Sequence, residues 1–364
     1  MSIERFELFP LRLRFKRPFL TAAATVTERQ VAVLRLTDAD GAIGLGEVAP
    51  YPHPRFGGLA DLVGVLELEA RPCLEGCAID DAALAVEELG ARLPAPALTA
   101  VDLALMDLQA RRRNVPLADW LDRPARRRVD VNATIAADSA DEAAELAAGF
   151  VADGFRTLKL KVGMPDDQQR VSAVRNAAGQ NTRLRLDANG AWSPTEAVEK
   201  INALTEFGLE LIEQPVKATD LAGMHRVRES VPVPVVADEG VRDASDLRRH
   251  VRDGACDGVA VKLSQVGGMS RANVLVDQAE RAGLFCIVTS TLDGGVGLAA
   301  GLHFAAARPE IELACGLATQ SLFENDYAIG VPSVIDGTMT ISAAPGLGVE
   351  LDDRLLAELS LDLG

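Results

Sequence analysis

The chain has 364 residues, of which 48% are hydrophobic, so it is long enough for two or three domains or for one barrel with additions. Its 53 acidic residues outnumber the 37 basic ones, and the formal charge of −16 argues against a nucleic-acid binder. We expect no membrane span, because no apolar run reaches about 18 residues, and no secretory segment at the N-terminus. Five cysteines without a metal-ligand spacing predict a reduced, cytoplasmic protein.

The N-terminal region is expected to be an α+β unit. The stretches IERFELFPLRLRF and RQVAVLRLTDADGAIGLGEVAP alternate as strands do, and the second contains a turn signal at residues 38–41. Between about Leu59 and Arg113 the apolar residues have helical spacing, and the last helix ends in basic residues that suit its dipole. We predict that residues 1–127 form a capping domain.

From about residue 128 strand-like and helix-like segments alternate. Eight short apolar runs start at intervals of roughly 24 to 28 residues, near residues 129, 157, 183, 209, 234, 258, 284 and 311. Helix signals lie between them, such as Ser139-x-x-Glu142 and Ser193-Pro194. A doubly wound sheet is the alternative, but eight even units favour a closed (β/α)8 barrel, a modified TIM barrel. We predict an α/β fold with this barrel at residues 128–322, and a C-terminal segment at 323–364 that returns to the cap. Within this segment, ISAAPGLGVELDDRLLAEL is expected to be strand and loop.

Lysines and acids stand at the predicted C-terminal ends of the strands, where barrel active sites lie. Lys159 and Lys161 share one face of the second strand, which in an isolated case usually means a solvated sheet edge. The next three strands, however, end in carboxylates, and the sixth strand carries Lys262. The three acids are Asp187, Glu213 and Asp238.

Each acid alone could be a turn or capping residue, but that does not explain three acids on three consecutive strands. Carboxylates that converge at a barrel mouth cannot all stay charged without a cation. Oxygen-only ligands suit a hard divalent ion, so we predict Mg²⁺, or Mn²⁺ in its place. Such a metal stabilises the dianion formed when the carbon next to a substrate carboxylate loses a proton to a lysine. The pattern predicts proton abstraction α to a carboxylate.

The order Lys-x-Lys, Asp, Glu, Asp, Lys on successive strands resembles the enolase superfamily and, within it, the muconate lactonizing enzyme subgroup. The segment GLGEVAP at 44–50 resembles a Gly-x-Gly-Glu turn of that family's cap. Sites of the superfamily pair a lysine base with Mg²⁺. The resemblance covers nearly the whole chain and implies that the three acids are metal ligands. It also implies that Lys161 and Lys262 are acid/base groups on opposite sides of the substrate, and that Lys159 tunes Lys161.

Members of this subgroup differ in reaction. The eighth strand end, ACGLATQ, lacks the Asp-x-Asp by which dipeptide epimerases resemble one another, which disfavours that activity. STLDGGVGLAAGLHFAAA looks most like o-succinylbenzoate synthases, with Gly294 and Gly295 in place of a Thr-Ser pair. We predict dehydration to o-succinylbenzoate in menaquinone biosynthesis, with N-succinylamino acid racemisation and muconate cycloisomerisation as alternatives. A non-catalytic binding barrel is disfavoured by the intact set of acids and lysines.

The substrate is expected to be a small carboxylate, with no nucleic acid or membrane partner, and the chain is expected to form a homo-oligomer. Cap loops at 17–27 and 49–58 are expected to select the substrate, although ordinary surface loops are the alternative. The predicted substrate contacts are Thr21, Tyr51, Asn189, Glu239, Ser290, Leu292, Asp293 and Gly316.

Overall fold

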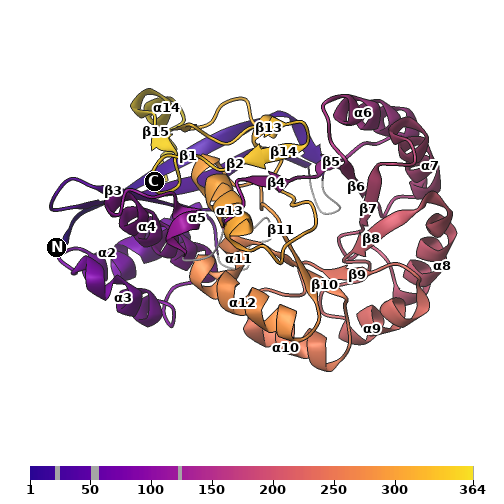
Figure 1. Ribbon diagram of the computed structural model, residues 1–364, viewed down its shortest axis with the longest axis horizontal. Coiled ribbons are helices and arrows are strands. Elements are labelled where there is room, and N and C mark those ends of the chain that lie inside the picture. The colour runs from indigo at the N-terminus through magenta and orange to yellow at the C-terminus, as the bar shows by residue number, and fades with distance from the viewer. Residues whose placement is uncertain (21–24, 51–56, 122–124, 364) are drawn as a thin grey trace.

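The N-terminal region forms an antiparallel sheet covered by helices, and it lies beside a curled parallel sheet (Figure 1). The computed structural model describes residues 1–20, 25–50, 57–121 and 125–363. The antiparallel sheet has the order β1 (Ile3–Leu20), β2 (Thr25–Asp38) and β3 (Ile43–Val48). The predicted turn joins β2 to β3, and Gly41 has φ 83°, a conformation that glycine adopts without strain.

The helical segment predicted after Leu59 is confirmed. It comprises α1 (Leu59–Val65), the π-helical η1 (Leu66–Ala70), α2 (Arg71–Leu74), η2 (Ile79–Asp81), α3 (Ala82–Leu89) and α4 (Ala95–Arg112), with the short α5 (Leu117–Trp120) after it. The α4 helix is buried along most of its length and packs on β3. A Cβ on Gly46 would collide with the carbonyl of Ala100, so glycine permits this close contact. The Gly-x-Gly-Glu segment is therefore part of strand β3, and our description of it as a turn was wrong.

The barrel prediction is confirmed by a seven-stranded parallel sheet whose order is β11-β10-β9-β8-β7-β6-β5. Its strands are β5 (Ala133–Ile135), β6 (Thr157–Lys161), β7 (Arg183–Asp187), β8 (Leu209–Glu213), β9 (Val235–Ala237), β10 (Gly258–Val261) and β11 (Phe285–Val288). The eighth predicted run forms single parallel bridges in place of a strand. Cys315 pairs with Val131 and Gly316 pairs with Thr289, so this run joins the two edges of the sheet.

Helices follow each of these strands and surround the sheet (Figure 1). They are α6 (Ala140–Ala152), α7 (Asp167–Ala178), α8 (Pro194–Leu204) with η3 (Thr205–Phe207), α9 (Leu221–Ser230), α10 (Ala244–Arg252), α11 (Leu263–Val266), α12 (Met269–Arg281) and α13 (Gly295–Ala307). The predicted caps are present, since Ser139 accepts a hydrogen bond from the Glu142 amide and Ser193 begins α8 in a capping box. Among the described residues, no helix has both the length and the apolar character that a bilayer crossing requires.

The C-terminal segment returns to the cap, as predicted. It contains η4 (Gln320–Leu322), β12 (Ala328–Ile329), β13 (Val334–Ile335), β14 (Thr338–Thr340), β15 (Glu350–Leu351) and α14 (Asp353–Glu358). The β14 strand pairs with β4 (Arg128–Asp130), and Leu359 O accepts a 2.8 Å hydrogen bond from the amide of Arg12 on β1. α14 is helical where we expected strand and loop. The domain boundaries at residues 127 and 322 stay predictions.

Candidate active site

The three predicted acids meet at the C-terminal ends of β7, β8 and β9. Asp187 and Glu213 are partners in the β7–β8 register, so the pairing of the strands sets their carboxylates at one level. With Asp238, just after β9, they offer oxygens that all lie within 4.8 Å of one another. None of the three residues is more than 2% exposed. The convergence expected from the sequence is therefore present in the fold.

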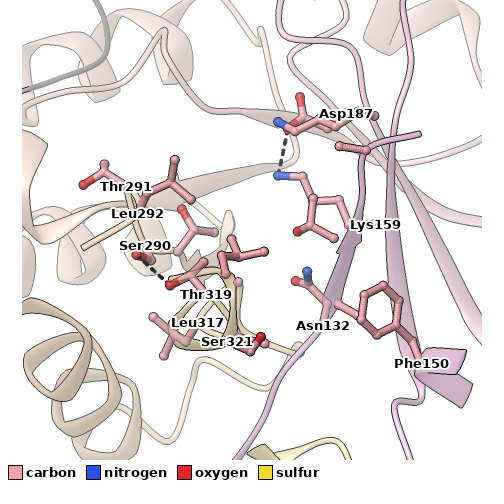
Figure 2. Close-up of a pocket in the computed structure, with 18 of the residues that line it drawn as sticks. Asn132, Phe150, Lys159, Asp187, Ser290, Thr291, Leu292, Leu317, Thr319 and Ser321 are labelled. Carbon is pink, nitrogen blue, oxygen red and sulfur yellow. Dashed lines mark hydrogen bonds and ion pairs between the residues drawn. The ribbon is translucent and has the colours of Figure 1, made fainter. Parts of the chain in front are cut away.

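Three lysines neutralise these acids. Lys159 Nζ lies 2.8 Å from Asp187 Oδ2 and 2.6 Å from Glu213 Oε1, and Figure 2 shows Lys159 and Asp187 pointing toward each other. Lys161 Nζ lies 2.7 Å from the same Asp187 oxygen. Lys262, which follows β10, places Nζ 2.7 Å from Asp238 Oδ2. Each ammonium group of the paired lysines on β6 thus faces a carboxylate and not bulk water.

The buried charges shift the proton affinities of the cluster. Burial alone would lower the pKa of Lys159, but the charges of Asp187, Glu213 and Asp238 raise it above its usual value. Burial would raise the pKa of Asp187, but Lys159 and Lys161 hold it well below its usual range. Burial raises the pKa of Glu213 to about 7 despite the charge of Lys159, and the two aspartates add to this rise. The cluster is therefore poorly solvated and rich in oxygen donors.

This donor set fits a hard divalent cation. The three carboxylate oxygens come from different strands and face a common centre, and carboxylate ligands are those that Mg²⁺ prefers in proteins. The surrounding residues leave one side of the cluster open to a cavity, where water or substrate could complete a coordination shell. The residues present are thus compatible with the metal that the sequence predicts.

The cavity has a volume of about 1110 Å³, and the three lysines, Asp187 and Asp238 line it. Most of the predicted substrate contacts line it too, namely Asn189, Glu239, Ser290, Leu292 and Gly316. Figure 2 labels two of them, Ser290 and Leu292. Asp293 and Glu213 are not among the described lining residues. Asp293 accepts hydrogen bonds from Ser290 Oγ at 2.9 Å and from the Thr291 amide at 3.1 Å, so its carboxylate stabilises its own loop. Thr21 and Tyr51 lie outside the described residues.

Asn189 links Lys161 to a further carboxylate. Its Oδ1 accepts a 2.8 Å hydrogen bond from Lys161 Nζ, and its Nδ2 donates a 2.8 Å bond to Glu239 Oε1. Burial raises the pKa of Glu239, and the charge of Asp238 adds to the rise. Asn189, Gln214 and Leu292 are three of the five described non-glycine residues with positive φ, a strain that often marks functional sites. The backbone around the cluster is therefore held in place by its surroundings.

Several lining residues were missed from the sequence. Two are buried side chains that point into the barrel: Asn132, before β5, and Thr289, after β11. Arg185 NH1 donates to Asn132 Oδ1 at 3.4 Å and also to the Ala314 carbonyl at 2.6 Å. Other missed lining residues include Thr134, Phe150, Leu317, Thr319 and Ser321. The only signal for Asn132 and Thr134 was that they alternate with apolar residues in the strand-like run that starts near residue 129. Neither residue is an acid or a base.

The comparisons with known families agree with this architecture. The model described as "Mandelate racemase / muconate lactonizing enzyme, N-terminal domain" matches residues 6–121, and "Enolase C-terminal domain-like" matches residues 142–355. The chain therefore belongs to the enolase superfamily, in its mandelate racemase and muconate lactonizing enzyme group. Like its relatives there, it is an enzyme of the lyase or the racemase and epimerase type.

Individual relatives carry out different reactions. The L-Ala-D/L-Glu epimerase of Bacillus subtilis (strain 168) is 30% identical over 96% of this chain and 97% of its own. The o-succinylbenzoate synthase of Thermobifida fusca (strain YX) is 40% identical over 66% of this chain and 73% of its own. The crystal structure of N-succinyl Arg/Lys racemase from Bacillus cereus ATCC 14579 superposes with a TM-score of 0.93 at 26% identity, over 100% of this chain and 99% of that one. These relatives leave the reaction of this chain to be inferred.

Proposed function

We propose that this enzyme uses Mg²⁺ to abstract a proton from the carbon α to a carboxylate, and that its reaction is dehydration to o-succinylbenzoate. One observation carries the proposal: three buried carboxylates lie within 4.8 Å of one another beside lysines from both sides of the barrel mouth. Asp187, Glu213 and Asp238 would hold the metal. When bound, it would polarise the substrate carboxylate and stabilise the negative charge that develops on deprotonation.

The two outer lysines would carry the proton chemistry. Lys161 ends β6 and Lys262 follows β10, and these strands are separated by β7, β8 and β9, so the lysines face the cavity from opposite sides. Lys161 as a free amine would take the α proton and, as the ammonium, would return a proton to the departing hydroxide, which leaves as water. Lys262 would remain charged beside Asp238 and stabilise the enediolate oxygens.

Lys159 would tune this base. Lys159 and Lys161 contact the same oxygen of Asp187, at 2.8 Å and 2.7 Å, so their nitrogens are close together. The fixed charge of Lys159 would thus add positive potential beside Lys161 and the substrate carboxylate. The role of Lys159 is therefore electrostatic, and it transfers no proton itself.

Two observations favour the synthase reaction. The identity with the Thermobifida fusca synthase is 40% where it aligns, against 30% with the Bacillus subtilis epimerase. The residues that line the cavity at the eighth strand end are Gly316, Leu317, Ala318, Thr319 and Gln320, and none of them offers a carboxylate to a substrate ammonium. The product would serve menaquinone biosynthesis, in the cytoplasm. The homo-oligomer stays a prediction.

N-succinylamino acid racemisation is the second candidate. Lysines on both sides of the cavity are what a two-base racemase needs, because each enantiomer presents its α proton to a different side. The fold is also similar to that of the N-succinyl Arg/Lys racemase. In this reaction Lys161 and Lys262 would be alternate bases.

One experiment separates the two reactions. The Mg²⁺-loaded protein is given the cyclohexadiene carboxylate that loses water to form o-succinylbenzoate, and separately each N-succinylamino acid enantiomer in D₂O. We expect rapid dehydration. Rapid deuterium exchange of both enantiomers without dehydration would favour the racemase. Failure of both reactions, with Mg²⁺ bound, would overturn both substrate assignments.

A further inference from the structure

The loop after β11 forms one wall of the cavity. Residues 290–294 lie in the connection from β11 to α13, and Ser290, Thr291 and Leu292 line the cavity (Figure 2). Leu292 has φ 66°, an unfavourable conformation for a branched side chain. Such a conformation persists only where neighbouring groups hold it. The question is which groups hold this loop.

A carboxylate from the cap binds the end of the loop. Glu47, on β3, is 3% exposed, and it accepts hydrogen bonds from the Gly294 amide at 2.8 Å and the Gly297 amide at 3.0 Å. These amides belong to the first turn of α13, where unpaired N–H groups and the helix dipole favour an anion. Glu47 of the capping domain therefore accepts hydrogen bonds from the N-terminus of the barrel helix α13. This helix begins where the cavity loop ends.

Two further side chains complete the contact. Tyr327, fully buried in the C-terminal segment, donates its hydroxyl to Glu47 and accepts a 3.1 Å hydrogen bond from the Val296 amide. Arg29, on β2, donates to the Leu292 carbonyl at 3.3 Å and to the Pro50 carbonyl. The strained residue and the end of the loop are thus each bound by the cap.

The glycines of this segment make room for the contact. A Cβ on Gly294 would lie 2.6 Å from a ring carbon of Tyr327 and 3.1 Å from a carboxylate oxygen of Glu47. A Cβ on Gly297 would lie 2.8 Å from Asp293 Cβ. Real Cβ atoms do not approach this closely, so this close approach of Tyr327 and Glu47 requires glycine here.

We propose that Glu47 is a positioning residue for substrate binding: it holds residues 290–294 against the cap and thereby fixes the cavity wall that Ser290 and Leu292 form. Glu47 acts through this loop, because it is not among the described residues that line the cavity. The expected effect on KM rests on the proposed function. The claim that Glu47 holds residues 290–294 in place does not.

The test uses Glu47→Gln and Tyr327→Phe in the Mg²⁺-loaded protein. The Gln side chain has one oxygen, and its amide group faces the second backbone N–H without accepting a bond, so one strong hydrogen bond is lost. We expect KM for the dehydration substrate to rise about 10-fold with kcat changed less than about 3-fold and Mg²⁺ affinity unchanged. Tyr327→Phe removes one hydroxyl and should raise KM in the same direction by less.

Asp102→Asn is the matched control. Asp102, on α4 of the cap, is 1% exposed and accepts a 3.1 Å hydrogen bond from the Ser270 amide in the first turn of α12. Like Glu47, Asp102 is a buried acid of the capping domain that binds the N-terminus of a barrel helix. The segment that it contacts, residues 263–270, is not among the described residues that line the cavity. This variant should lower the melting temperature and leave KM unchanged.

Amide hydrogen exchange of residues 290–297 supplies a readout that needs no turnover. Exchange should accelerate in Glu47→Gln and Tyr327→Phe and not in Asp102→Asn. Unaltered exchange in both test variants, or a KM change as large in Asp102→Asn, would overturn the inference. If Glu47→Gln does not fold, KM and hydrogen exchange of the Tyr327→Phe variant test the inference by themselves. If the wild type does not dehydrate the substrate, the proposed function fails, while hydrogen exchange still tests whether Glu47 holds the loop.

Discussion

Replacement of Lys159 by methionine should destabilise the metal-free protein more than any other single change among the site lysines. Lys159 is 9% exposed, and its ammonium lies 2.8 Å and 2.6 Å from carboxylates of Asp187 and Glu213. Methionine has a similar length and an adaptable side chain but carries no charge. The variant therefore keeps most of the packing and leaves two buried carboxylates without the cation between them.

The magnitude follows from these distances. At an effective dielectric constant of 20, each contact contributes about 6 kcal/mol of attraction. Desolvation of the ammonium cancels several kcal/mol, and loss of one partner of a buried ion pair typically costs about 3–5 kcal/mol. Lys161→Met is the matched control, because the Lys161 side chain is 22% exposed and its second partner is the neutral Asn189. It should cost about 1–2 kcal/mol.

Urea unfolding in EDTA, followed by circular dichroism, measures both variants against the wild type. Mg²⁺ should then stabilise Lys159→Met more than the wild type, because a divalent cation replaces the missing charge. A Lys159→Met protein that is as stable as the wild type in EDTA, or more stable than Lys161→Met, would refute this reading of the charge cluster.

Three further predictions concern other parts of the molecule. Asp238→Asn should weaken Mg²⁺ binding more than about 100-fold in calorimetry, and undiminished binding would remove it from the ligand set. Gly46→Ala should cost at least about 1–3 kcal/mol in urea unfolding, because its Cβ collides with the Ala100 carbonyl, and an unchanged midpoint would contradict that contact. Burial lowers the pKa of His303 to about 4, and its neutral Nδ1 accepts a hydrogen bond from the Ala118 amide. Its stabilising contribution is thus present above pH 6.5 and lost as pH falls to 4, by about 3 kcal/mol, and His303→Gln should show a correspondingly smaller loss of stability over that range.

The features that a repeated local pattern encodes could be predicted. The even spacing of apolar runs predicted the barrel, and the residue type at each strand end predicted the meeting of Asp187, Glu213 and Asp238. These predictions succeed because strand pairing in register brings successive strand ends to one level. The prediction that the eighth run forms a strand was wrong. Two isolated bridges, at Cys315 and Gly316, join this run to the edges of the sheet without an extended row of backbone pairs.

Contacts between distant segments gave no local signal. Glu47 and Gly294 are 247 positions apart, and the Gly-x-Gly-Glu pattern that drew attention to Glu47 gave no indication of its partner. Asn132 and Thr289 line the cavity next to the first and last strands of the parallel sheet, but as neutral residues they lacked the charge that singled out the strand-end acids. α14 was missed because it is a single short helix, although Asp352 caps it by accepting hydrogen bonds from Arg354 N and Leu355 N.

The central claim is that proton abstraction depends on a metal held by the three strand-end acids. Its most direct test is the dehydration rate of the wild-type protein after dialysis against EDTA, before and after addition of excess Mg²⁺. The account predicts that turnover is lost in EDTA and restored by Mg²⁺, and that Asp187→Asn is not restored. Undiminished turnover of the wild type in EDTA would contradict it.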